Sequence, residues 1–244
     1  MDIGFERIHP TPAYPPGLSP ANFTAVDWSS RAGHVLNFKA TLKTQLRHIQ
    51  LGRCCYCRRF LPDPMATDLE HFIEKAVYPS FTFEILNLAL SCGTCNSMKN
   101  AKFMRLNRYL SRRAKTGAGS VVTTRHCPTL TTNPLPLAAV PNNSAAYRWV
   151  HPHLDDYSDH LAIQKGWVFI WRSAKGFRTV RGLELNALAQ LERRAIAERL
   201  ASRTGQLSLL VGALAELNHA TAKDVGALVA EELRRRRRAR GTNR

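Results

Sequence analysis

The chain has 244 residues, of which 44% are hydrophobic, so it can bury a core and is not expected to be globally disordered. Its 35 lysines and arginines outnumber 18 acidic residues, and the net charge of +17 favours a polyanionic partner, most often nucleic acid. No apolar run is long enough to span a membrane, and the acidic, proline-rich start of the chain is unlike a signal peptide. We therefore expect a cytoplasmic protein, in which paired cysteines favour metal binding over a disulfide framework.

Residues 1–52 form the first of three predicted regions. Prolines favour an extended, loop-rich conformation for residues 1–33, and Trp28 is available to pack this segment onto the body. Residues 34–51 place apolar side chains at helical spacing with lysine and arginine side chains opposite them, which predicts an amphipathic helix. That helix should end at Gly52, because glycine readily adopts the left-handed conformation of a helix cap.

Residues 53–118 contain two Cys-x-x-Cys pairs, Cys54/Cys57 and Cys92/Cys95. Two such pairs supply the four thiolates of the tetrahedral site that zinc prefers. Cys55 is a competing ligand, but only Cys54 has the required spacing to Cys57. The 34 residues between Cys57 and Cys92 exceed the usual interval of a zinc ribbon, which indicates that a further element is inserted between the pairs.

The segment between and just after the cysteine pairs carries side chains suited to a second metal and to proton transfer. Glu70 and Asn96 offer a carboxylate and an amide oxygen, ligands that suit magnesium or manganese better than zinc. His71 is mostly neutral near neutral pH and can accept a proton from water. If residues 69–73 form a strand, Glu70 and His71 face opposite sides, and one site can use both only if the strand bends or ends there. Asn87 is expected in a second strand, where its amide can tie a loop backbone and so aim the histidine.

A helix is expected to begin after Cys95 and to continue through residues 104–118. Lys99, Lys102 and Arg105 are spaced three apart in this segment, so they are expected roughly on one side of the helix. There they can hold a phosphate backbone, which makes nucleic acid the predicted partner.

The third predicted region, residues 119–244, begins with a long connection rich in threonine, proline and asparagine. His126 and Cys127 lie in this connection, either as a further metal-ligand pair or, as we prefer, as an incidental pair. Helices are predicted within residues 183–240. Near the end, the basic run Arg234–Arg238 either grips phosphates or forms a solvated tail.

The middle of this region carries an apolar run from Trp167 to Trp171, followed by Ser173-Ala174-Lys175-Gly176, which predicts a β-hairpin. Histidine and aspartate side chains cluster just before this run: His151, His153, Asp155, Asp156, Asp159 and His160. They are either a metal site or polar turn residues beside the hairpin, and we prefer the second interpretation.

The ordered set of motifs resembles the HNH (ββα-metal) endonucleases. The set comprises Cys-x-x-Cys, Glu-His, Asn-Leu, Cys-x-x-Cys-Asn and a lysine three residues on. The resemblance implies that His71 is the general base, that Glu70 and Asn96 bind a catalytic Mg²⁺ or Mn²⁺ ion, and that Asn87 orients the base. It also implies that the four paired cysteines bind a structural Zn²⁺ ion.

A narrower resemblance is to the PtuB nucleases of Septu anti-phage systems and to retron-associated HNH effectors. It rests on CCYC at 54–57, EHFIEK at 70–75 and NLALSCGTCNSMK at 87–99, with looser similarity in the downstream HPHLDD…GLELN…ERR pattern. Glu74 departs from the family, which usually has proline before Lys75. The resemblance implies cleavage of DNA that leaves 5′-phosphate and 3′-hydroxyl ends, and a PtuA-type ATPase partner.

The predicted architecture is therefore α+β, with a zinc-stabilised ββα-metal core embedded in a mainly helical protein. The predicted function is metal-dependent cleavage of DNA. The alternative is a non-catalytic zinc module that binds nucleic acid or scaffolds a complex. It uses the same cysteines and the same basic charge but does not need Glu70, His71 or Asn96.

Overall fold

The computed structural model describes residues 3–61, 67–116, 125–134 and 139–192, with positions 227 and 231 beyond them. Within these residues the fold is mixed α/β, with two small antiparallel sheets. The first sheet pairs β1 (Thr67–His71) with β2 (Leu88–Cys92), and the second pairs β3 (Leu161–Ile163) with β4 (Phe169–Trp171). The α-helices are α1 (Gly33–Ile49), α2 (Gly93–Thr116), α3 (Tyr157–His160) and α4 (Ala174–Gly182). Short 3-10 turns cover Pro20–Phe23, Pro79–Phe81, Ile85–Asn87 and Ser144–Ala146.

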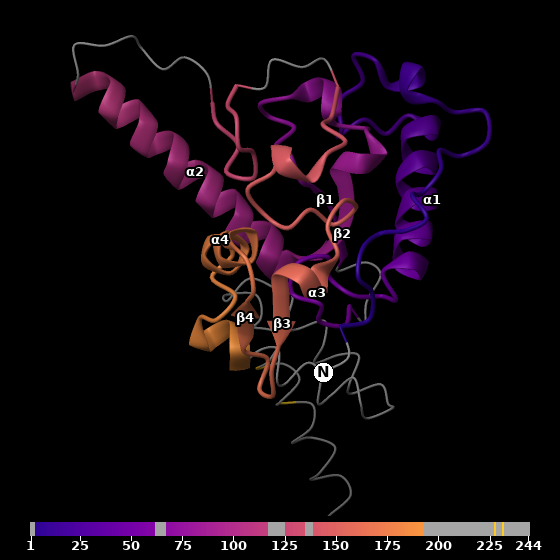
Figure 1. Cartoon of the computed structure of the whole chain (residues 1–244). Helices are drawn as coiled ribbons and strands as arrows, with labels where there is room; N and C mark the ends of the chain where they lie inside the picture. Colours follow the sequence, from indigo (N-terminus) through magenta and orange to yellow (C-terminus); the bar gives the residue numbers. More distant parts are fainter. Residues whose placement is uncertain are drawn as a thin grey trace, which may run out of the picture.

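The two long helices flank the first sheet, with α1 and α2 on opposite sides of β1 and β2 (Figure 1). The predicted amphipathic helix is confirmed as α1, whose side chains Val35, Phe38, Leu42 and Leu46 are fully buried. The helix ends earlier than expected, at Ile49, and Leu51 is the first residue after it in the left-handed conformation, with a φ of 51°. Gly52 follows with a φ of 64°, and its N–H donates to the carbonyl of Arg47 over 2.8 Å.

The N-terminal segment is extended apart from its 3-10 turn, as predicted, and it packs aromatic side chains against α1, the loop before β2 and the end of β1. The Phe23 ring lies 4.6 Å from that of Phe83 and 4.9 Å from that of Phe38, measured between centroids. Trp28 packs edge-on against His71, with centroids 4.5 Å apart. This segment therefore contributes directly to the surroundings of the predicted base.

Strand β2 leads directly into α2, so the second cysteine pair lies at a strand-to-helix junction. Gln50, just after α1, satisfies the free edge of β2: its amide nitrogen donates to the carbonyl of Leu90, and its amide oxygen accepts from the N–H of the same residue. The N–H of Cys55 also donates to the Leu90 carbonyl. The first cysteine pair is thereby held against the middle of β2, close to the second pair.

The predicted hairpin exists, but its boundaries differ from those expected. Its turn lies between β3 and β4, before the apolar run ends, and Ser173 begins α4 rather than a β-turn. The Ser173 hydroxyl caps this helix by accepting the N–H of Gly176 over 3.0 Å. A side chain at Gly176 would place its Cβ 2.0 Å from the carbonyl oxygen of His160, so α4 can approach α3 only with glycine there.

The histidine–aspartate cluster packs the second sheet onto the first. Asp155 is buried, and its carboxylate accepts from Lys175 Nζ at 2.6 Å and from the N–H of His151 at 2.6 Å. The ring of His153 bonds through Nε2 to the carbonyl of Leu88 in β2 over 2.8 Å. The cluster is not a metal group among the described residues. His151, His153 and Asp155 are buried, whereas Asp159 is exposed. The predicted helices beyond residue 192 and the run Arg234–Arg238 lie outside the described residues.

Candidate metal centre and active site

The four paired cysteines converge as the spacing predicted. The Sγ atoms of Cys54, Cys57, Cys92 and Cys95 all lie within 4.8 Å of one another, and all four residues are buried. Sulfur atoms bound at ~2.3 Å to one tetrahedral ion stand about 3.8 Å apart, and the Sγ atoms of Cys57 and Cys92 are 3.8 Å apart. The cluster could therefore bind a metal ion, and its size suits zinc.

The backbone around the cluster is arranged for thiolates. The N–H of Cys92 donates to Cys54 Sγ and the N–H of Cys95 donates to Cys92 Sγ, each over 3.4 Å. Without a cation, burial raises the pKa of the Cys54 thiol, and the neighbouring Cys54 thiol raises those of Cys92 and Cys95. Binding of a metal ion at this position would thus release protons. Neither Cys55 nor Cys127 belongs to the cluster, although both are buried.

Glu70, near the end of β1, is buried in an ion-pair network. Its Oε1 atom lies 2.9 Å from Lys99 Nζ and accepts a hydrogen bond from the Tyr56 hydroxyl at 3.2 Å. Lys99 also contacts Glu74 Oε1 and the carbonyl of His71, each at 2.6 Å. Burial alone would lower the pKa of Lys99, but the two carboxylates raise it above its usual range, so the ammonium stays charged. Glu74 is thus a second anchor for this lysine.

His71 ends β1 and is held by the loop that follows. Its Nε2 atom lies 3.0 Å from the carbonyl oxygen of Thr82. A carbonyl only accepts hydrogen bonds, so Nε2 carries the proton and Nδ1 keeps a lone pair. Burial and the nearby charge of Lys75 lower the pKa of His71 to about 3, so the ring is neutral at physiological pH.

Asn87 ties the loop between the two strands, through the backbone contacts that an amide can make. Its Oδ1 atom accepts from the N–H of Ile73 at 2.6 Å, and its Nδ2 atom donates to the carbonyls of Ile73 and Phe81. Phe81 immediately precedes Thr82, whose carbonyl holds His71. Asn87 lies in the 3-10 turn just before β2 and not in the strand itself.

Asn96, in the first turn of α2, contacts a carboxylate that sequence reasoning did not single out. Its Nδ2 atom donates to Asp68 Oδ2 over 2.8 Å. Asp68 and Glu70 lie two residues apart on β1 and so share a face of the strand. Asn96 and Lys99 lie three residues apart on α2, and each meets one of these acids. Two polar contacts therefore fix α2 against β1.

The predicted base and the two predicted ligands of the catalytic metal line one pocket of about 360 Å³, even though Glu70 and His71 alternate along β1. Asn87 does not line it. The pocket is lined by Glu70, His71 and Asn96, together with Glu74, Lys75 and Lys99. The strand ends at His71, which is the condition under which both residues can serve one site. The cysteine cluster lies next to this pocket along the chain, because Asn96 directly follows Cys95.

The three cations predicted to hold phosphate are not equivalent. Lys99 is 2% exposed and its ammonium is surrounded by oxygen atoms of the protein, so it cannot grip a phosphate backbone at the surface. Lys102 and Arg105 are exposed on α2, and Arg105 pairs with Glu184 at 2.9 Å. Their contact with nucleic acid stays a prediction.

Several residues of the site escaped sequence reasoning: Tyr56, Asp68, Glu74, Trp28 and Lys39. Asp68 lies two residues before Glu70, but the strand was expected only over residues 69–73, and the structure starts it at Thr67. For Trp28 and Lys39, which come from other segments, the linear spacing held no signal.

Comparison of the chain with protein-family models, curated sequences and solved structures gives no match. In the described part of the chain, no helix combines the length and the apolar character needed to cross a bilayer.

Proposed function

We propose that the protein is a metal-dependent endonuclease of the HNH type that hydrolyses DNA phosphodiester bonds. The observation that carries the proposal is the convergence of Glu70, His71 and Asn96 on one pocket beside a four-cysteine cluster. The elements around this pocket follow the order strand, loop, strand, helix, which is the order of a ββα-metal core.

His71 is suited to act as the general base. Its proton sits on Nε2, against the Thr82 carbonyl, and Nδ1 makes no hydrogen bond within the described residues. Neutral imidazole with a free nitrogen can take a proton from water as the water attacks phosphorus. The pKa of about 3 makes the isolated base weak. A bound phosphodiester places negative charge beside the ring and so raises its basicity.

Glu70 and Asn96 are suited to hold the divalent cation. The lysine and tyrosine contacts of Glu70 both fall on Oε1, which leaves Oε2 for another ligand. Asp68 is an acceptor for the Asn96 amide nitrogen, so the amide oxygen is turned away from it. A Mg²⁺ or Mn²⁺ ion bound by these two oxygens would stabilise the charge that develops on the phosphate and the leaving oxygen.

A wider proposal rests on the motif resemblance alone. The nuclease would act in anti-phage defence, and a PtuA-type ATPase would restrain or license it. The net charge of +17 supports DNA as the partner, because neutralising phosphates releases counterions and drives association.

Plasmid cleavage tests the proposal. Supercoiled DNA should be nicked or linearised with added Mg²⁺ or Mn²⁺ and remain intact without a divalent cation. The Glu70→Gln variant should lose cleavage, because its amide cannot replace the carboxylate charge. DNA binding without cleavage under any of these conditions would favour the non-catalytic zinc module.

A further inference from the structure

Three separate segments bring cations and an indole ring together beside His71. Trp28 from the N-terminal segment packs against the His71 ring with centroids 4.5 Å apart. Lys39 from α1 and Lys75 from the loop after β1 place their ammonium nitrogens 4.5 Å and 5.7 Å from the centroid of the Trp28 ring. Lys75 also lines the pocket that holds Glu70 and His71.

Two ammonium groups on one indole repel each other unless an anion lies nearby. Asp27 is an exposed acid close enough to interact with both lysines: hydrogen bonds from Ser29 and the charges of Lys75 and Lys39 lower the pKa of its carboxyl. Its Oδ1 atom accepts from the N–H and the hydroxyl of Ser29 at 2.7 Å and 2.5 Å. The indole attracts cations through its negative face, but this attraction does not neutralise their charge. One carboxylate beside two ammonium groups leaves a net positive charge next to the Trp28 ring, and this charge favours an anionic ligand.

We propose that Trp28, Lys39 and Lys75 form a phosphate-binding subsite for a backbone phosphate of the nucleic-acid substrate. The inference rests on the proposed function, because it places the strand next to the base. Each ammonium has three N–H donors, and Lys39 uses one of them on the carbonyl of Trp28. The remaining donors of Lys39 and those of Lys75 bind phosphate oxygens, and the indole keeps both side chains in place.

This subsite takes the role that sequence reasoning gave to Lys99. Lys99 is buried among Glu70, Glu74 and the His71 carbonyl and serves the interior of the site. Lys75 is exposed and Lys39 half-buried, so both can meet a strand from solvent. The lowered pKa of Lys39, due to burial and to Lys75, agrees with cations held close together.

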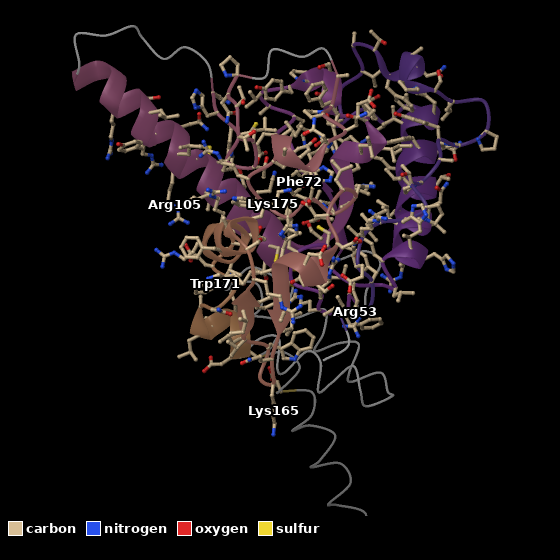
Figure 2. The ribbon with its side chains drawn as sticks, viewed as in Figure 1. Arg53, Phe72, Arg105, Lys165, Trp171 and Lys175 are labelled. Atoms are coloured by element: carbon tan, nitrogen blue, oxygen red, sulfur yellow. The ribbon has the colours of Figure 1, made fainter. Side chains whose placement is uncertain are left out.

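The test is equilibrium binding of a labelled DNA duplex of mixed sequence to the full chain, without added divalent cation, over a series of salt concentrations. Lys39→Gln, Lys75→Gln and the double variant are compared with Lys165→Gln. Lys165 is exposed in the turn between β3 and β4 and points away from the body (Figure 2), so its loss makes the same charge change elsewhere. Thermal melting confirms that each variant is folded.

Each substitution in the subsite should weaken binding several-fold and lower the slope of log K against log salt by about 0.9, the value for one lost phosphate contact. The double variant should lose about twice that slope, and Lys165→Gln should stay near wild type. A folded double variant that matches Lys165→Gln would overturn the subsite. Parallel cleavage by the wild type in Mg²⁺ separates the two proposals, because cleavage with unchanged slopes rejects the subsite alone. Lysine-dependent binding without cleavage in Mg²⁺ or Mn²⁺ rejects the nuclease alone.

Discussion

Single side chains decide how the pocket presents its oxygen atoms. Asn96 has both a donor and an acceptor, and its orientation is set by the group that it meets. Asp68 can only accept, so it selects the amide nitrogen and leaves the oxygen for a cation. Lys99 fixes Glu70 in a comparable way from the next turn of the helix. These positioning contacts should matter as much as the ligands themselves.

Replacing Asp68 by asparagine tests this arrangement. An asparagine at position 68 can meet Asn96 with either its nitrogen or its oxygen, so the Asn96 amide is free to turn. We expect the Mn²⁺ concentration for half-maximal cleavage to rise about tenfold or more, with little change in melting temperature. Asp159→Asn removes the same charge from the exposed face of α3 and should leave the metal requirement unchanged. An unaltered metal requirement in Asp68→Asn would show that the Asp68 contact does not position a ligand.

At the scale of secondary structure, the cysteine cluster fixes the start of α2 against the turn that follows α1. Its cysteines come from two segments, and α2 connects the second pair to the pocket. Asn96 and Lys99 follow the last ligand within one helical turn. The cysteine cluster thus sets the position of the residues that face Glu70, although it lies outside the pocket itself.

Cys92→Ala should remove one ligand of this cluster and release the metal. Binding of structural zinc contributes on the order of 10 kcal/mol to folding, so the variant should bind no zinc and be largely unfolded or insoluble. Cys55→Ala is the matched control, because this neighbouring thiol is equally buried but not part of the cluster. Zinc content by mass spectrometry and thermal melting give the readout. Normal melting of a zinc-free Cys92→Ala protein would refute a structural metal.

Local patterns predicted the elements well where one segment determines them. The Cys-x-x-Cys spacing predicted the cluster, and apolar periodicity predicted α1, because both depend on neighbours in the chain. Spacing by three misplaced Lys99 relative to Lys102 and Arg105. Each step of three residues turns about 60° short of a full circle, so Lys99 faces β1 while the later two face solvent. The hairpin turn was misplaced because a helix N-cap and a turn favour the same small polar residues.

The candidate site was only partly predictable, because some of its residues come from segments that are far apart in the sequence. Glu70, His71, Asn87 and Asn96 lie within one stretch of chain, and their order carried the resemblance. The contribution of Trp28 and Lys39 depends on how the N-terminal segment and α1 pack on the loop after β1. Nothing in the linear spacing encodes that packing.

At the scale of the whole molecule, buried neutral histidines connect the segment before α3 to the first sheet. His151 packs against Phe72 and Tyr147, with centroids 4.5 Å and 4.3 Å apart, and His153 bonds to β2. Burial lowers the pKa of His153 to about 4, that of His71 to about 3, and that of His151 well below its usual value.

These histidines should make the protein less stable as the pH falls below about 6.5. In the unfolded chain these histidines take up protons below about pH 6.5, whereas in the folded protein they stay neutral. Their contribution is fully present above that pH and is lost as pH falls toward 4. For each pH unit that the pH falls within this window, each histidine lowers the free energy of unfolding by about 1.4 kcal/mol.

His151→Phe measures the contribution of one histidine to the pH dependence of the free energy of unfolding, because phenylalanine keeps the aromatic contacts without a titratable group. Denaturant unfolding at several pH values between 6.5 and 4.5 should show a shallower pH slope for the variant than for wild type. Any acid loss of a cluster metal is common to both proteins and cancels in the difference. Equal slopes would mean that His151 is not held neutral in the folded state.

The central claim is that His71 is the base of a metal-dependent nuclease. Its most direct test is plasmid cleavage in Mg²⁺ or Mn²⁺ by wild type, His71→Ala and His34→Ala, with and without a co-encoded ATPase where one exists. His34 is exposed on α1 and outside the pocket, so its variant controls for loss of an imidazole. We predict that His71→Ala loses cleavage by a factor of at least 100 while retaining its fold and zinc, and that His34→Ala cleaves like wild type. Cleavage by folded His71→Ala at the wild-type rate would contradict the assignment.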